Sequence, residues 1–255
     1  MQIERGGWRA PPHALAMAKD QVHVWRATLD WPLEQVARLQ QWLSADERER
    51  LERFRSGRDR RRYLVGRGLL RTVIGRYLTL SPGVLRFDTT AAGKPRLAPG
   101  VAPQPLQFNL SHSGDLVLIA LASGRALGVD VEQVRADIEL AETAARFFSP
   151  TEQQALAALS GARQIDAFFD CWVRKEAYVK ARGEGLSLPL EQFDVSLLPG
   201  EPAQLIGTRP DPAEASRCRL TALDAGEGYR AALAVEGDGW MLQQWDWAGA
   251  YPRTG

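Results

Sequence analysis

The order of strand-like and helical periodicities along the 255 residues constrains the fold more than any other feature of the sequence. Residues 20–30 alternate and are rich in β-forming side chains, which predicts a strand. Helical spacing follows over 32–43, Ser44 and Glu47 form a capping-box pattern that predicts the start of a second helix, and a long helix is expected over 59–80. Further along the chain, strands are expected near 106–111, 115–122 and 127–133, helices near 138–147, 150–160 and 163–182, and strands again within 191–247.

Because strands and helices recur in similar proportion, we expect an α+β protein of two small, related subdomains. The predicted boundaries are 1–125 and 126–255, joined near 123–127. Residues 89–105 carry Gly93 and four prolines and are expected to form a loop.

Composition excludes several classes of protein. The 32 basic and 31 acidic residues give a net charge of +1, which does not favour binding to bulk nucleic acid or to a membrane surface. No apolar run approaches the ~20 residues of a membrane span. The N-terminus lacks a signal pattern, and two cysteines are too few for a disulfide framework. We therefore expect a reduced, cytoplasmic protein.

The strand "GVDVE" places two acids on one face. Residues two apart in a strand point to the same side, so Asp130 and Glu132 share a face. Two neighbouring carboxylates repel each other unless a cation lies between them, and a hard cation such as Mg²⁺ meets that need. The alternative is an ordinary solvent-facing edge strand, which a bare Asp-x-Glu pattern favours.

The segment "WVRKEAYVK" predicts a helix with a charged side. Glu176 and Lys180 are four residues apart with the acid first, the favoured order for an ion pair. The alternative is a surface pair of small energetic value. Trp172 and Tyr178 next to these charges suggest partial burial, which suits a site for a metal and a phosphate.

Cationic and hydroxyl side chains suited to phosphates occur in three further segments. "NLSHSG" offers Ser111 and His112 at an expected strand end, where backbone N–H groups can also hold phosphate. "AGKP" places Lys94 in a tight loop. The arginine-rich stretch 47–71 creates a local positive field, although most of its arginines are expected on solvated helix faces.

Taken in order, "AGKP", "NLSHSG", "GVDVE", "RFFSPTE" and "WVRKEAYVKARGEGLSLPL" resemble the 4'-phosphopantetheinyl transferases of the surfactin-synthetase-activating (Sfp) type. The resemblance runs from about Ser44 to Leu198. It implies two similar halves in a pseudo-twofold arrangement with the active site between them. It also implies transfer of the phosphopantetheine arm of coenzyme A to a serine of an apo acyl or peptidyl carrier protein, with release of adenosine 3',5'-bisphosphate. Fatty-acid, polyketide and nonribosomal-peptide carriers all remain open, and the family suggests a monomer.

The resemblance also implies roles for single residues. Mg²⁺ would be bound by Asp130, Glu132 and Glu176, and Lys180 would contact the coenzyme's phosphates. The rest of the coenzyme A site would be formed by Lys94, Ser111, His112, Arg50 and Arg62. Glu176 is the first candidate for the general base that deprotonates the carrier serine, and Asp130 and Lys180 complete the catalytic set. Glu152 is a second candidate base, with a helix N-terminal acid as its alternative role.

Two departures from the family pattern concern the nucleotide end. Glu47 stands where some members have a basic residue, and Tyr63 stands where a small hydroxyl residue can occur. The rival reading of the chain is a non-catalytic binder of coenzyme A or a carrier, against which the intact acids and lysine argue. The carrier is expected to dock on 135–149 and 181–190, with Leu186, Leu188 and Leu190 in contact, and the alternative is that these leucines cover the protein's own core.

Overall fold

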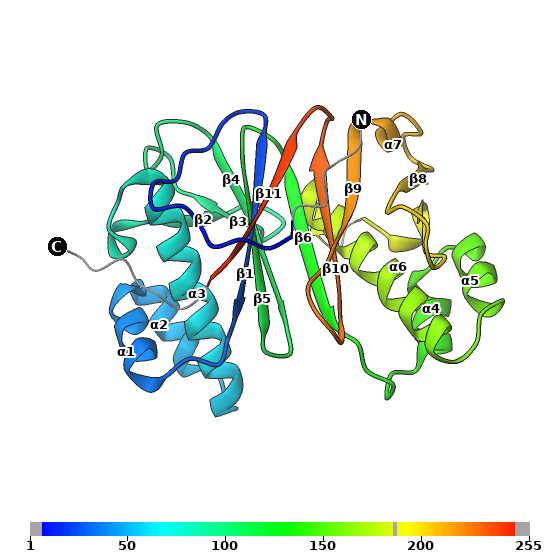
Figure 1. Ribbon diagram of the computed structural model, residues 1–255, viewed down its shortest axis with the longest axis horizontal. Coiled ribbons are helices and arrows are strands. Elements are labelled where there is room, and N and C mark those ends of the chain that lie inside the picture. Colours follow the sequence, from blue (N-terminus) through cyan, green and yellow to red (C-terminus); the bar gives the residue numbers. More distant parts are fainter. Residues whose placement is uncertain (1–6, 186–187, 248–255) are drawn as a thin grey trace.

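The computed structural model describes residues 7–185 and 188–247 and has four layers (Figure 1). Two β-sheets lie in the middle. Helices α1 (Leu33–Trp42), α2 (Ala45–Glu52) and α3 (Gly57–Leu78) cover the outer face of one sheet, and α4 (Leu140–Phe147), α5 (Pro150–Ala157) and α6 (Gly161–Arg182) cover the other. The α+β class and the two-part arrangement expected from the sequence are confirmed.

The first sheet has the strand order β11-β1-β5-β4. Its strands are β1 (Gln21–Thr28), β4 (Leu106–Ser113), β5 (Leu116–Ser123) and β11 (Met241–Asp246). β5 pairs antiparallel with both β1 and β4, whereas β11 pairs parallel with β1. The end of the described chain therefore returns to the sheet of the N-terminal half. The short helix η1 (Pro82–Val84) and a hairpin of β2 (Phe87–Thr89) and β3 (Pro95–Leu97) connect α3 to β4.

The second sheet has the order β6-β10-β9. It contains β6 (Leu127–Gln133), β9 (Cys218–Leu223) and β10 (Tyr229–Glu236), all antiparallel to their neighbours. Between α6 and β9 the chain forms η3 (Leu190–Gln192), the pair β7 (Phe193–Val195) and β8 (Leu205–Thr208), and the short helix α7 (Glu214–Arg217).

The two halves repeat one plan. Each begins with a strand, continues through helices that end in one of 22 residues, and closes with a hairpin whose later strand pairs with the first. Before each long helix an eight-residue helix starts with a capping box, Ser44 with Glu47 and Ser149 with Glu152. Both capping glutamates are buried and bind a cation at the fifteenth position of the long helix: Arg71 Nε lies 2.7 Å from Glu47 Oε2, and Lys175 Nζ lies 2.7 Å from Glu152 Oε2.

Three apolar clusters hold these layers together. One lies between α1, α3 and the first sheet, and a second lies between α6 and the second sheet. The third joins the inner faces of the two sheets and includes Val22, Val24, Leu118, Ala120, Val129, Val131 and Leu233. Because Val129 and Val131 face this inner cluster, the strand period turns Asp130 and Glu132 toward the opposite side.

Most of the helices and strands expected from the sequence are present near their predicted positions, with two corrections. The segment 89–105 is not wholly loop, since β3 lies within it and pairs with β2. His112 belongs to β4 rather than to a loop, because the strand continues to Ser113 before the turn at Gly114. None of the helices in the described ranges combines the length and apolarity that crossing a membrane requires.

Candidate active site

β4 and β6 run side by side, and polar side chains of β4 bridge the seam between them. Val129 N donates to Asn109 Oδ1 at 2.9 Å, and Gln133 N donates to Ser113 Oγ at 3.1 Å. Ser111 Oγ donates to Asp130 Oδ1 at 2.7 Å. A buried strand edge must satisfy its polar groups, and here side chains of the other half do so.

Asp130 lies at the centre of this seam. Its residue surface is 3% exposed, and its Oδ1 accepts hydrogen bonds from Ser111 Oγ and, at 2.5 Å, from Lys180 Nζ. Lys180 also donates to Ser111 Oγ at 3.0 Å. The acid closest to Lys180 is thus Asp130 of the strand. The other carboxylate oxygen, Asp130 Oδ2, is buried and accepts no hydrogen bond from the described residues.

Two further carboxylates share this environment. Ser113 Oγ donates to Glu132 Oε2 at 2.6 Å, and the pKa of Glu132 is raised mainly by burial and also by Asp130. Burial likewise raises the pKa of Glu176, with the charges of Asp130 and Glu132 adding to the effect. Carboxylates that raise each other's pKa are stabilised by a cation between them.

The three acids fit a hard cation by their chemistry. They supply carboxylate oxygens from β6 and α6, and the buried Asp130 Oδ2 accepts no hydrogen bond from the described residues. Over residues 7–185 and 188–247, however, no three His, Cys, Asp or Glu side chains are already grouped as a metal site. Lys180 instead supplies the positive charge next to Asp130.

Lys94 is turned toward the main chain. Its Nζ donates to the carbonyl oxygens of Leu127 at 2.8 Å and Lys180 at 2.6 Å, and burial lowers its pKa to about 8. The hairpin turn of the N-terminal half is thereby tied to β6 and to the last turn of α6. A pocket of about 600 Å³ adjoins Lys94 between residues 95–108 and 181–183.

His112 and Arg62 lie on the α3 side of the seam. The His112 side chain retains solvent exposure, yet partial desolvation lowers its pKa, and the positive charges of Arg62 and Lys180 lower it further. The positive charges that act on His112 therefore come from both halves, Arg62 from one and Lys180 from the other. Arg62 forms an ion pair with Asp115 at 2.8 Å.

The structure does not bring Arg50 into this group. Its guanidinium lies over the Tyr63 ring, 5.5 Å from the centroid, on the exposed face of α2. Most other arginines of the 47–71 stretch are also at the helix surface, as expected, and several pair with nearby acids.

Glu47 and Glu152 have structural partners. Glu47 binds Arg67 and Arg71, so this departure from the family pattern forms a buried ion pair within the helical layer. Glu152 is 1% exposed and binds Lys175, the N–H of Ser149 and the N–H of Val195. With these partners it is unsuited to act as a base, and its role as a helix N-terminal acid is favoured.

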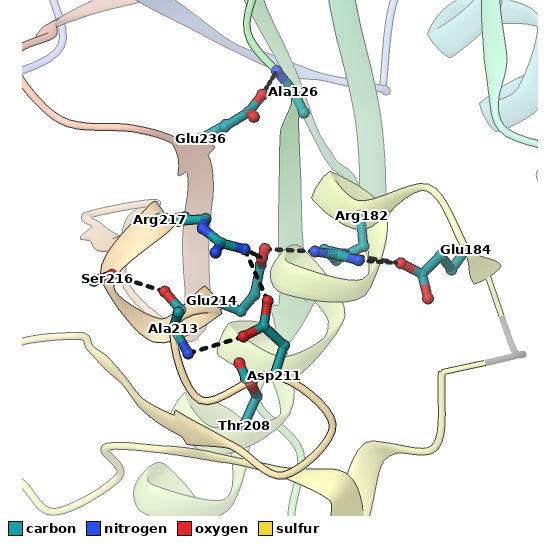
Figure 2. Close-up of polar contacts among 10 residues, drawn as sticks. All are labelled: Ala126, Arg182, Glu184, Thr208, Asp211, Ala213, Glu214, Ser216, Arg217 and Glu236. Carbon is teal, nitrogen blue, oxygen red and sulfur yellow. Dashed lines mark hydrogen bonds and ion pairs between the residues drawn. The ribbon is translucent and has the colours of Figure 1, made fainter.

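A clamp of charged residues secures the end of α6 (Figure 2). Arg182 Nη1 lies 2.6 Å from Glu214 of α7, and Arg182 Nη2 lies 2.6 Å from Glu184. Arg217 pairs with Asp211 at 2.8 Å and approaches Glu214. The helix that carries Glu176 and Lys180 is thus fixed just beyond the site. Leu186, proposed for docking, lies outside the described residues.

Sequence reasoning missed two residues on which the site depends. Gly128 lets α6 lie against β6, because a Cβ there would come within 2.2 Å of Ala177 O and 2.3 Å of Ala181 N. The glycine before the acidic pair in "GVDVE" was the available signal. Ser113 was noted only as a hydroxyl suited to phosphate, whereas it holds Glu132; its two-residue spacing from Ser111 could have indicated that role.

Comparison with known proteins agrees with this architecture. Residues 25–124 match the family model "4'-phosphopantetheinyl transferase, N-terminal", and residues 126–234 match "4'-phosphopantetheinyl transferase superfamily". The chain is 40% identical to 4'-phosphopantetheinyl transferase HetI of Nostoc sp., covering 93% of this chain and 97% of that protein. It is 37% identical to 4'-phosphopantetheinyl transferase Sfp of Bacillus subtilis, covering 81% and 89%. Asp130, Lys180 and Ser111 meet at the seam of two matched halves, and the chain belongs to the 4'-phosphopantetheinyl transferase superfamily and is of the Sfp type.

Proposed function

We propose that the seam between β4, β6 and α6 transfers the 4'-phosphopantetheine arm of coenzyme A to a serine of an apo acyl or peptidyl carrier protein. The observation that carries this proposal is the buried Asp130, whose Oδ2 has no partner among the described residues, beside Glu132 and Glu176 with raised pKa values. Such a group is suited to a cation and a pyrophosphate, and perturbed acids in a cleft are typical of catalytic sites.

Asp130, Glu132 and Glu176 are proposed to hold Mg²⁺. Their oxygens are the ligands this ion prefers. When bound, Mg²⁺ would neutralise the pyrophosphate of coenzyme A and polarise the phosphorus under attack. Ser111 and Ser113 would keep two of the carboxylates oriented, since each donates a hydrogen bond to one of them.

The reaction exchanges one P–O bond for another. The carrier serine Oγ forms a bond to the β-phosphorus, and the bond from that phosphorus to the bridging oxygen breaks, so adenosine 3',5'-bisphosphate leaves with the electron pair. The serine proton passes to Glu176, the first candidate base by the family resemblance, directly or through a water molecule. Lys180 stabilises the negative charge that develops on the leaving bisphosphate.

The coenzyme is proposed to lie along the same seam. Arg62 and His112 would bind phosphate at the α3 side, and Ser111 would line the centre. Lys94 would contact the ligand from the hairpin, in addition to holding the α6 carbonyl. Arg50 would have to swing from its position over Tyr63 to take part, which makes it the outermost of the five residues.

The remaining features follow the family resemblance. We propose a cytoplasmic monomer with functional halves 1–125 and 126–255, acting in fatty-acid, polyketide or nonribosomal-peptide synthesis. Cys171 and Cys218 are free and buried, which suits a reducing compartment.

The test is a transfer assay read by intact mass. The purified chain is incubated with coenzyme A, Mg²⁺ and apo carriers of the three classes, and one carrier is expected to gain a phosphopantetheine group. A carrier whose serine is replaced by alanine should not gain mass, and Glu176→Gln should slow the gain by roughly 10²-fold or more. Binding of coenzyme A and carrier without any mass gain would favour the non-catalytic alternative instead.

A further inference from the structure

The turn between β4 and β5 is held rigidly by both halves of the protein. Gly114 has a φ of 56°, and a Cβ there would lie 2.6 Å from both Gln133 Oε1 and Tyr229 Oη. The next residue, Asp115, donates its N–H to Tyr229 Oη at 3.3 Å, and its carbonyl oxygen accepts from Leu29 N at 2.7 Å. The backbone of Asp115 is therefore fixed from β10 and from the end of β1.

The Asp115 carboxylate projects from this fixed backbone to the first turns of α3. Its Oδ1 accepts two hydrogen bonds from Arg62, from Nη2 at 2.8 Å and from Nε at 3.3 Å. Its Oδ2 accepts a longer one from Arg58 at 3.4 Å. The Arg58 side chain is 69% exposed, whereas the Arg62 side chain is 18% exposed, so Arg62 is the more strongly ordered of the two.

Arg62 keeps free binding capacity in this arrangement. A guanidinium has five N–H donors, and Nε and one N–H of Nη2 suffice for Asp115. The remaining donors can still bind a phosphate. Arg62 is also close enough to lower the pKa of His112, which Lys180 lowers as well. His112 adjoins Ser111 on β4, and Ser111 Oγ accepts a hydrogen bond from Lys180, so Arg62 lies on the same side of the seam as the proposed site.

We propose that Asp115 is a positioning residue that holds Arg62 ready for a phosphate of coenzyme A. The inference rests on the proposed function and deepens it. The proposal predicts an effect of removing Asp115 on coenzyme A affinity that is opposite to the effect expected from charge alone. If charge alone mattered, removing the Asp115 anion near a phosphate site would tighten binding of an anionic ligand. If Asp115 holds Arg62 in place, its removal should weaken binding, because the ligand must then order a mobile arginine side chain at a cost in free energy.

The experiment compares Asp115→Ala with wild type by calorimetry, titrating coenzyme A in the presence of Mg²⁺. The dissociation constant should rise about three- to tenfold, the range expected for ordering one long side chain. Asp115→Asn keeps an acceptor oxygen and should fall between the two proteins. In the transfer assay the Michaelis constant for coenzyme A should rise while kcat stays near wild type, because Asp115 does not touch the reacting atoms.

Asp30 offers a matched control. It pairs with Arg61, the neighbour of Arg62 on α3, at 3.1 Å, and its side chain is 83% exposed. Asp30→Ala removes the same charge from an arginine outside the proposed site and should leave coenzyme A affinity unchanged. A general effect of net charge would instead alter both variants alike.

A double-mutant cycle with Arg62→Ala isolates the pair. If Asp115 acts through Arg62, Asp115→Ala should change affinity little in the Arg62→Ala background. Tighter or unchanged binding by Asp115→Ala, or an equal loss in both backgrounds, would overturn the inference. Failure of the proposed function would look different, since wild type itself would then neither bind coenzyme A nor modify a carrier.

Discussion

Replacing Gly128 by alanine tests whether close contact between β6 and α6 sets the geometry of the site. Gly128 lies two residues before Asp130, and the main chain of α6 passes directly over it. An added Cβ would lie 2.2 Å from Ala177 O, 2.3 Å from Ala181 N and 2.8 Å from the carbonyl carbon of Lys180. All three are backbone atoms of the helix, so no side chain can rotate away to make space.

The size of the effect follows from these distances. An ordinary contact begins near 3.4 Å, so the helix would have to move by about 1.2 Å from the strand. Overpacking of this kind costs about 1–3 kcal/mol, occasionally more, and the rigidity of two backbones favours the upper end. A displacement of about 1 Å at a reacting group lowers a rate by roughly 10²-fold. Glu176 and Lys180 both belong to the displaced segment of α6.

The assay measures unfolding by urea and transfer to a carrier for the same protein. Gly128→Ala is expected to unfold at lower urea and to lose turnover by about 10²-fold even where it is fully folded. Gly66→Ala is the control, because Gly66 is also buried, although in α3, and its Cβ would meet only Leu29 Cδ2 at 4.0 Å. That variant should be neutral or more stable by up to about 1 kcal/mol. Wild-type stability and turnover in Gly128→Ala would refute the argument.

Three further changes test other parts of the structure. Asp130→Asn should lower turnover by roughly 10²-fold or more with a small change in melting temperature; near-wild-type rates in saturating Mg²⁺ would contradict the metal assignment. His23 is 3% exposed, and burial lowers its pKa to about 4. The free energy of unfolding that depends on a neutral His23 is therefore fully present above pH ~6.5 and is lost as the pH falls toward 4. Urea unfolding at several pH values should show that His23→Gln removes at most about 3 kcal/mol of the pH dependence of the free energy of unfolding, whereas His13→Gln, at an exposed position, leaves it unchanged. The same pH dependence in His23→Gln as in wild type would contradict burial of a neutral imidazole. Lys94→Ala should reduce the free energy of unfolding by about 1–3 kcal/mol, because two carbonyl oxygens lose their donor; weaker coenzyme A binding at unchanged stability would instead assign Lys94 to the ligand alone.

The elements and the acidic face were predictable because they depend on local rules. The capping box at Ser44 starts α2, and helical spacing gives α3 nearly its full length. A strand period of two is enough to place Asp130 and Glu132 together, on the side opposite Val129 and Val131. Each of these inferences uses residues within a few positions of one another.

The partners of the charged groups could not be predicted in this way. Helical spacing suggested that Lys180 pairs with Glu176, but packing of α6 on the strands brings it to Asp130, 50 residues away. Lys94 donates to main-chain carbonyls, which carry no signature in the sequence. The return of β11 to the first sheet is equally non-local, since it depends on pairing across more than 200 residues with β1. Such choices are decided by tertiary contacts, which override local propensity.

The two matched halves explain why the site lies at their seam and not within either one. At the sixteenth position of the long helix, the C-terminal half has Glu176 and the N-terminal half has Thr72. Thr72 is buried and donates to Gly68 O, so it offers nothing to a cation. The fifteenth position holds a structural cation in both halves, so the halves share this buried ion pair and differ at the neighbouring position. The N-terminal half contributes instead the hydroxyls of β4 and the arginines at the start of α3. In the proposed site, the acids and Lys180 of one half meet the hydroxyls and arginines of the other, so the proposed catalysis requires the packing of the two halves.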